Sequence, residues 1–434
     1  MDYLPPQETQ NRIQKIRHYI ANNYPELSGI FIFSRISIYY FTGTLANGVL
    51  WIPLENEPIL FVRKGLERAK KESSLTYIYP YKSYSEIEKI CHELNMPIAE
   101  NWQLGIETTG ITYQLAQLFF SKIKAFQNSK PYPIDDAIKY IRSIKSEYEA
   151  KFMREAGKRQ ALALEKILPF AIQEYLEKGE QTYSYLKNFD ENLLTAYPQE
   201  KELTEKKIAE ICIAIYTELE HGKMCRMSAH GEESFYGHVA LGNSLNTAHY
   251  YNGAMGFQGL HPALPCLGSN TLLTKNTPLC VDMLFNYKGY NTDKTQCYFY
   301  GKEKNLPDIA KKALDFCIEI QDMVINTLKQ GTIPEEIWFN TLEKVKQYHF
   351  EENFMGYKQN SVPFLGHGIG LTVDENPVLA KNFKEPLENG MFIACEPKIG
   401  IPNFGMIGIE NTFELIDNSV KNITSLGNNI IYLA

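Results

Sequence analysis

The sequence lacks the features that mark secreted, membrane-spanning and nucleic-acid-binding proteins. Its apolar runs, such as residues 29–33, have the length of a strand and stop far short of the roughly 20 residues that cross a bilayer. It has no long basic block, and its formal net charge is −7, so nothing draws it to nucleic acid or anionic lipid. The first residues have neither the basic region nor the apolar core of a secretory signal. We therefore expect a cytoplasmic protein that binds neither nucleic acid nor a membrane.

Paired cysteine motifs are also missing. The eight cysteines are scattered and no two form a CxxC pair. Such cysteines are typical of free thiols in a reducing compartment, and they argue against a thiolate metal site. The hydrophobic content of 44% and charged content of 22% are ordinary for a soluble globular protein and exclude extensive disorder. A chain of 434 residues predicts more than one domain.

The first part of the chain alternates helical and strand patterns. Ile13, Ile16 and Ile20 recur at helical spacing. Short apolar runs bounded by turn residues predict buried strands at residues 29–34, 39–44, 48–53 and 58–63. We therefore predict a small α/β domain over residues 1–130.

A polar stretch with two prolines, residues 127–136, marks the end of this domain. We predict a linker over residues 131–145 and a second domain over residues 146–434. The second domain opens with a capping box at Ser146 and Glu149, and further helices are predicted at residues 203–222 and 307–330. Residues 165–203 are loosely patterned and suggest an insertion.

Two stretches of the second domain predict β-hairpins that carry opposed acids. A loop at Tyr287–Lys288 places Asp282 opposite Asp293, and a loop centred on Asn403 places Glu396 opposite Glu410. Opposed residues share a face of the hairpin, with Cβ atoms roughly 4.5–5.5 Å apart. Two buried carboxylates at that distance repel each other, and a cation between them removes the conflict.

His367 adds an imidazole to these acids from a glycine-flanked apolar segment, residues 366–370. Taken singly, each of the five residues is an ordinary turn, edge or core residue. Taken together they form a ligand set that suits Mn, Co, Fe or Zn. Four carboxylates suit two divalent ions roughly 3.5–4 Å apart, which would share a bridging water and lower its pKa.

These residues resemble the ligands of the pita-bread metallopeptidases, a group that includes methionine aminopeptidase, Xaa-Pro aminopeptidase and prolidase, with creatinase as a non-metal relative. The ordered set is Asp282, Asp293, His367, Glu396 and Glu410. Residues 12–65 resemble the N-terminal domain of creatinase, prolidase and Xaa-Pro aminopeptidase. The resemblance therefore implies a creatinase-like α/β N-terminal domain followed by an α+β pita-bread catalytic domain.

The resemblance also implies a reaction, namely hydrolysis of a peptide bond next to proline. Asp293 and Glu410 would bridge two ions, Asp282 would complete one ion, and His367 and Glu396 the other. Glu396 would act as general base. The implied cofactor is two divalent ions, with Mn expected and Co, Zn or Fe as alternatives. The implied partners are a short proline-containing peptide and a second copy of the chain in a homodimer.

The residues that would contact the substrate depart from the resemblance. Asp374 stands where a second histidine is usual, and it either pairs with a cationic substrate group or is a solvated loop acid. The usual arginine and tyrosine are Gly408 and Gly400, and two further family positions are held by Leu284 and Gln296. The predicted metal ligands are thus retained while the substrate contacts are rewritten.

A second substrate-contacting histidine is expected on the loop before the first ligand strand. His249 resembles it, with His261 as a rival and a structural role as the alternative, whereas His230 and His238 receive no assignment. Three functions follow. The first is an Xaa-Pro aminopeptidase or prolidase. The second is a C–N hydrolase or lyase of a small metabolite on the same scaffold. The third is a binding protein without turnover, which the complete ligand set disfavours.

Overall fold

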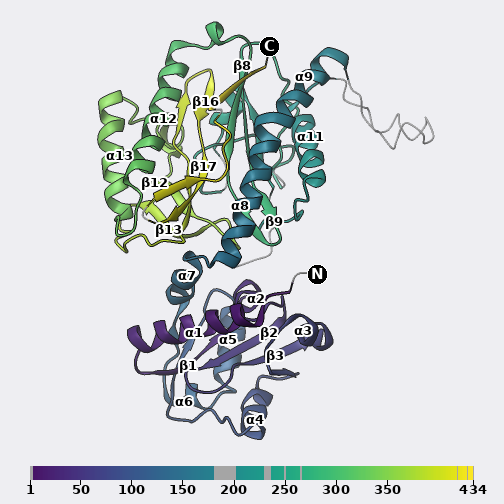
Figure 1. The fold of residues 1–434 in the computed structure, drawn as a ribbon, viewed down its shortest axis with the longest axis vertical. Helices are drawn as coiled ribbons and strands as arrows, with labels where there is room; N and C mark the ends of the chain where they lie inside the picture. The colour runs from purple at the N-terminus through teal and green to yellow at the C-terminus, as the bar shows by residue number, and fades with distance from the viewer. Residues whose placement is uncertain are drawn as a thin grey trace, which may run out of the picture. The chain divides into compact units, whose positions relative to one another are not determined.

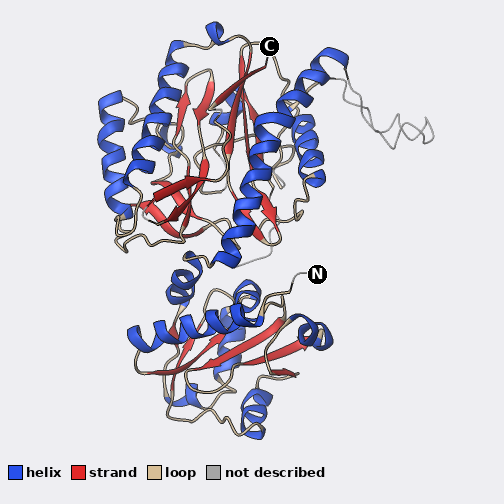
Figure 2. Cartoon of the chain, in the orientation of Figure 1, coloured by secondary structure: helices blue, strands red, loops and turns tan. Residues whose placement is uncertain are grey.

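The computed structural model describes residues 3–179, 202–228, 236–248, 251–263, 266–417, 419–427 and 429–433. These residues divide into two units, one up to Arg142 and one from Ser143 onward, with Ser228 grouped with the first. Figure 1 shows the chain coloured from its N-terminus to its C-terminus, and Figure 2 shows its helices and strands. No helix in the described ranges has both the length and the apolar character needed to cross a bilayer.

The first unit is a six-stranded sheet in the order β4-β3-β2-β1-β5-β6. The strands are β1 (Leu27–Ile32), β2 (Asn47–Pro53), β3 (Ile59–Lys64), β4 (Tyr77–Pro80), β5 (Gln103–Ile106) and β6 (Tyr132–Pro133). The helices are α1 (Pro6–Asn23), α2 (Arg35–Thr42), α3 (Leu66–Glu72), α4 (Ser85–Glu93), α5 (Tyr113–Phe120) and α6 (Ala125–Asn128). Helix α1 buries the predicted stripe of three isoleucines, and Figure 1 shows it across the near face of the sheet with α5 behind.

One predicted strand of this unit is wrong, because residues 39–44 belong to the end of helix α2 and the turn that follows. The helix ends at Gly43, whose φ of +80° is a left-handed conformation that glycine adopts without strain. At the start of α2, the buried Glu107 carboxylate accepts hydrogen bonds from the backbone N–H groups of Phe33 and Ser34 at 2.8 and 2.7 Å. Contacts from distant residues thus outweigh the local preference of an aromatic, β-branched segment.

Residues 131–145 contain ordered structure. Strand β6 pairs in parallel with β5 at the edge of the first sheet. Helix α7 (Asp135–Ser143) follows it. The segment therefore continues the first unit up to Arg142 before the second unit begins.

The second unit is built on two larger sheets, with orders β19-β11-β8-β7 and β13-β12-β14-β17-β18, and two short ladders, β9-β10 and β15-β16. The strands are β7 (Gly237–Leu241), β8 (Thr277–Met283), β9 (Phe285–Tyr287), β10 (Tyr290–Thr292), β11 (Thr295–Tyr300), β12 (Phe364–Gly368), β13 (Glu375–Ala380), β14 (Phe392–Cys395), β15 (Lys398–Ile401), β16 (Gly405–Gly408), β17 (Asn411–Ile416), β18 (Ser419–Asn422) and β19 (Ile430–Leu433).

Helices cover the outer faces of these sheets. They are α8 (Glu147–Leu162), a π-helical turn (Ala163–Ile167), α9 (Leu168–Lys178), α11 (Glu205–Glu218), α12 (Asp308–Thr327) and α13 (Pro334–Tyr348). The first four share a core with β7, β8 and β11, and α12 and α13 share another with β14 and β17. Figures 1 and 2 show the strands between the two groups of helices. The inner faces of the strands are thereby left to build a site.

The main helices of this unit were largely foreseen. The predicted capping box opens α8, with Ser146 and Glu149 bonded reciprocally. Helices α11 and α12 fall inside the predicted ranges, whereas α13 was not predicted. Of the suggested insertion, residues up to Lys178 are helical and residues 180–201 lie outside the described residues.

Candidate metal centre

The first hairpin forms, but its register differs by two residues from the prediction. Lys288 and Gly289 make the turn, with φ of +52° and +95°, and glycine as the second residue suits such a turn. Asp282 is consequently opposite Thr295 rather than Asp293. Because side chains alternate with a period of two, the shift leaves both acids on the face that was predicted.

The register of the second hairpin is confirmed. Cys395 pairs with Asn411 on one side of the two glutamates, and Lys398 pairs with Gly408 on the other. Glu396 and Glu410 therefore lie opposite each other between the two ladders. Asn403 occupies the loop in a left-handed conformation, with φ of +58°.

His367 lies on β12, between β13 and β14. A Cβ atom on Gly366 would lie 2.1 Å from the carbonyl oxygen of Ala394, and one on Gly368 would lie 2.0 Å from that of Asn376. The glycines that flank His367 therefore allow the neighbouring strands to approach closely. His367 Nδ1 is 3.0 Å from the carbonyl oxygen of Gly368. As a donor there it leaves Nε2 unprotonated and able to bind a metal.

Asp293, His367 and Glu410 are brought together. Each offers one ligand atom, and the three atoms lie within 4.8 Å of one another. His367 Nε2 is 4.0 Å from Asp293 Oδ2, which is too long for a hydrogen bond but suits two atoms on either side of an ion. Asp293 Oδ1 is buried and has no hydrogen-bond partner among the described residues. A buried orphan oxygen is costly, so these residues fit one divalent ion.

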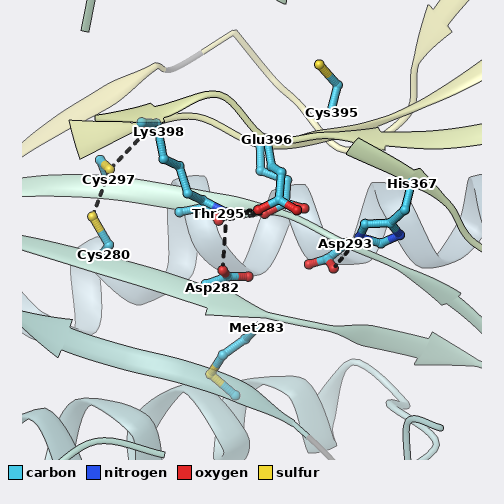
Figure 3. A network of polar contacts seen from close by, with 12 residues as sticks. Cys280, Asp282, Met283, Asp293, Thr295, Cys297, His367, Cys395, Glu396 and Lys398 are labelled. Carbon is cyan, nitrogen blue, oxygen red and sulfur yellow. Dashed lines mark hydrogen bonds and ion pairs between the residues drawn. The ribbon is translucent and has the colours of Figure 1, made fainter. Parts of the chain in front are cut away.

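The other two predicted ligands, Asp282 and Glu396, are bonded to a residue that the sequence analysis did not single out. Lys398 Nζ donates to Glu396 Oε2 at 2.7 Å and to Glu410 Oε2 at 2.9 Å, and it lies 3.4 Å from Asp282 Oδ2. Its side chain is only 1% exposed. In Figure 3 the Lys398 side chain reaches the carboxylates from one end of the cluster, and His367 lies beside Asp293 at the other.

Burial and neighbouring charges shift the pKa values of the clustered acids in opposite directions. Burial, together with the charges of Glu410 and Asp282, raises the pKa of Asp293 well above its usual range. Burial raises the pKa of Glu410 to about 7, although Lys398 opposes the shift. Burial would raise the pKa of Asp282 too, but Lys398 and His238 lower it below its ordinary value. The cluster is therefore short of positive charge at Asp293, the acid that Lys398 does not contact.

A cavity of about 90 Å³ opens onto this cluster. Its lining includes all five predicted ligands together with Asp374, and it also includes His238. Asp374 is exposed, and its charge helps to raise the pKa of His367 against the opposing effect of burial. Of the two candidate substrate histidines, His249 lies outside the described residues, and His261 is exposed and does not line this cavity.

His238 and Lys398 were not predicted as members of the site. His238 faces Asp282 across the β7–β8 ladder, and β7 was not predicted, so nothing placed it near the acids. Lys398 carried a usable signal. It follows Glu396 by two residues in an extended strand and therefore lies on the same face, and the hairpin register that paired the glutamates also sets Lys398 opposite Gly408.

Comparison with known proteins agrees with this arrangement. Residues 151–417 match the Metallopeptidase family M24, and residues 12–144 match the Creatinase/Prolidase N-terminal domain. The chain is 24% identical to the Xaa-Pro dipeptidase of Pyrococcus furiosus over 417 residues, which cover 96% of this chain and 98% of that protein.

Solved structures share the fold across both units. The Xaa-Pro dipeptidase from Bacillus anthracis superimposes with a TM-score of 0.74 at 22% identity, covering 98% of this chain and all of the other. The prolidase from Pyrococcus horikoshii gives 0.70 at 22% identity, covering 97% and 100%. The predicted fold, a creatinase-type α/β domain followed by a pita-bread catalytic domain, is thus confirmed. The family match spans more than half of the sequence and the predicted ligands fall within it, so the chain is a member of metallopeptidase family M24.

Proposed function

We propose that this chain is a metal-dependent hydrolase of short peptides, of the Xaa-Pro dipeptidase or Xaa-Pro aminopeptidase type. The observation that carries the proposal is the convergence of Asp293, His367 and Glu410 at a cavity in an M24 chain. The Xaa-Pro dipeptidases among its relatives support proline-containing dipeptides as the substrate class. Resemblance to the family also leads us to expect a cytoplasmic homodimer.

Membership of family M24 implies a dinuclear metal site. Asp293, His367 and Glu410 would hold an ion, and Mn²⁺ is the one we expect, with Co²⁺, Zn²⁺ or Fe²⁺ as alternatives. A bound divalent ion supplies a water of lowered pKa and a positive charge for the oxyanion that forms during hydrolysis. Glu396 lines the cavity, and its Oε2 is occupied by Lys398, so Oε1 is the atom that would take up the proton of the attacking water.

The cavity sets a further acid beside the predicted ligands, where the free amino group of a dipeptide would lie. Asp374 lines the cavity with an exposed carboxylate and is placed to pair with the free amino group of such a substrate. A carboxylate recognises an ammonium group by charge-assisted hydrogen bonding. We therefore assign Asp374 to substrate binding, with His249 as a second contact.

The second candidate is a C–N hydrolase or lyase that acts on a small metabolite. Gly400, where the resemblance expects tyrosine, favours it. A Cβ on Gly400 would lie 2.8 Å from the carbonyl oxygen of Gly356 and 3.0 Å from Tyr357 Cδ2. The local structure thus has no room for an aromatic side chain at position 400, and a substrate contact expected of a peptidase is missing there.

A panel of substrates separates these candidates. The full chain would be stripped with a chelator, reloaded with Mn²⁺, Co²⁺ or Zn²⁺, and given Xaa-Pro dipeptides, Xaa-Pro-Xaa tripeptides and Xaa-Ala controls. Cleavage restricted to Xaa-Pro dipeptides would establish a prolidase, and release of the first residue from the tripeptides an aminopeptidase. If metal-loaded protein cleaves none of them, the peptidase proposal fails and the second candidate replaces it.

Two variants test whether turnover depends on the metal centre. Asp293→Asn removes a ligand of the centre. Asp308→Asn makes the same chemical change on a fully exposed side chain of α12 and serves as its control. Turnover that depends on the centre is lost in the first variant and kept in the second.

A further inference from the structure

The Lys398 ammonium group is held by three acids at once. It bonds to Glu396 and Glu410 and lies within 3.4 Å of Asp282, and these are three of the five residues predicted to bind metal. An ammonium group has three N–H donors and no acceptor. All of its hydrogen-bonding capacity is therefore directed at the predicted metal ligands.

The oxygen atoms that accept these bonds are not available to bind a metal ion. Glu410 Oε2 accepts from Lys398 at 2.9 Å and from the Thr295 hydroxyl at 2.7 Å. Two donors occupy both lone pairs of that oxygen, which leaves Oε1 for an ion. A carboxylate that bridges with one ion on each oxygen needs both oxygens free. Glu410 cannot bridge in that way in this arrangement, and the ligand group that remains is Asp293, His367 and Glu410.

The position of Lys398 is built into the second hairpin. Lys398 and Gly408 are directly opposed on β15 and β16, so the lysine stem passes over the glycine. A Cβ on Gly408 would lie 2.5 Å from Lys398 Cγ. The lysine stem therefore lies where the side chain of the arginine expected at position 408 would begin. Only glycine leaves that space free.

We propose that the Lys398 ammonium group takes the place of one of the two metal ions, so that the centre of this chain binds a single divalent ion on Asp293, His367 and Glu410. The inference rests on the proposed function only in taking the centre as metal-binding, and it is independent of the substrate. A second dication would have to displace a buried ammonium group that bonds to Glu396 and Glu410. Like charges in a buried cluster repel strongly, so ammonium and second ion exclude each other.

The number of bound ions tests this inference. The full-length protein would be stripped of metal, titrated with Mn²⁺ by calorimetry, and assayed for metal per chain by elemental analysis after gel filtration in excess Mn²⁺. We expect one Mn²⁺ per chain, with the electron paramagnetic resonance spectrum of an isolated ion. Two ions per chain with an exchange-coupled spectrum would overturn the inference, and so would protein that binds none.

A pair of variants identifies the residue responsible. Lys398→Ala should raise the content from one ion to two per chain, because it frees the oxygens that the ammonium group occupies. The control is Lys145→Ala, which removes another lysine of 1% side-chain exposure whose partner, Glu375, lies outside the predicted ligands. That variant should keep one ion. Folded Lys398→Ala that still binds one ion would overturn the role given to Lys398.

The outcomes are separable from those of the substrate panel. One ion per chain without peptide cleavage would support the role of Lys398 and contradict the peptidase proposal. Two ions per chain with peptide cleavage would contradict the role of Lys398 and support the peptidase proposal. If Lys398→Ala does not fold, the ion count and spectrum of the unmodified protein still decide the question.

Discussion

His238 lies directly opposite Asp282 on neighbouring strands, and its ring centroid is 4.0 Å from that of Phe257. Opposed residues share a face, and both His238 and Asp282 line the cavity. The histidine is 8% exposed, so its position is set by packing. His238 is therefore a fixed polar group beside the acids, within reach of a bound substrate.

We predict that His238→Ala weakens catalysis without changing metal content. Loss of a hydrogen bond to a charged group in a buried site costs roughly 1.5–3 kcal/mol, which corresponds to a fall of about 10- to 150-fold in kcat/KM. Steady-state kinetics and elemental analysis of the same preparation measure the two effects. His92→Ala, on an exposed position of α4, is the control. Unchanged kcat/KM in His238→Ala would show that the residue only fills space.

Asp293→Asn should abolish metal binding and turnover, and it should also stabilise the metal-free protein. Burial and two neighbouring acids raise the pKa of Asp293, so its charge is unfavourable when no ion is present. Replacing it with an amide of the same shape removes a penalty on the order of 1–3 kcal/mol. Urea unfolding of chelated samples at pH 7 measures the change. A metal-free variant less stable than the parent would contradict this account of the centre.

His221 should make stability depend on pH. Burial lowers its pKa to about 4, despite a hydrogen bond to the backbone of Leu284 that opposes the shift. As the pH falls below about 6.5, His221 therefore binds a proton in the unfolded chain but not in the folded protein. The contribution of His221 is present above pH 6.5 and is lost as the pH falls toward 4, amounting to roughly 2 kcal/mol between pH 7 and pH 5.

His221→Phe tests this contribution. The ring of His221 stacks on Tyr216 and Tyr236, so phenylalanine preserves the aromatic contacts and removes the titrating group. The unfolding free energy of the variant should fall less between pH 7 and pH 5 than that of the parent. Equal slopes in urea titrations at the two pH values would show that His221 does not titrate in this way.

The sequence carried enough information to place the acids, because strand periodicity is insensitive to small errors. The first hairpin was misplaced by two residues, yet Asp282 and Asp293 stayed on the predicted face. The second hairpin was predicted in its true register because its loop residue, Asn403, tolerates a left-handed conformation. Periodicity and turn chemistry are local properties, and a single sequence reveals them.

Features that depend on contacts between distant segments could not be predicted from local sequence patterns. Residues 39–42 end a helix because Glu107, far along the chain, anchors its first turn. His238 reaches the cluster because β7 pairs with β8 across a long intervening segment. Lys398 is different, since strand alternation alone places it on the same face as Glu396. A lysine does not bind metal, however, so its residue type does not mark it as a member of a metal site.

Gly408→Ala should destabilise the protein through the same contact that seats Lys398. The added Cβ would lie 2.5 Å from both Lys398 Cγ and the carbonyl oxygen of Pro397. Overpacking of this kind costs typically 1–3 kcal/mol. Gly253→Ala is the control, since a Cβ there meets no atom of the described residues within 4 Å, and its unfolding free energy should match that of the parent.

A double-mutant cycle separates the side-chain clash of Gly408→Ala from its backbone clashes. In the background of Lys398→Ala the contact with Cγ disappears, whereas the contacts with the Pro397 carbonyl oxygen and with the Cα of residue 398 remain. The cost of Gly408→Ala, measured by urea unfolding of metal-free protein, should therefore shrink in that background without vanishing. An equal cost in both backgrounds would mean that the lysine stem moves aside freely. The ammonium group would then be too loosely held to keep a second ion out of the centre.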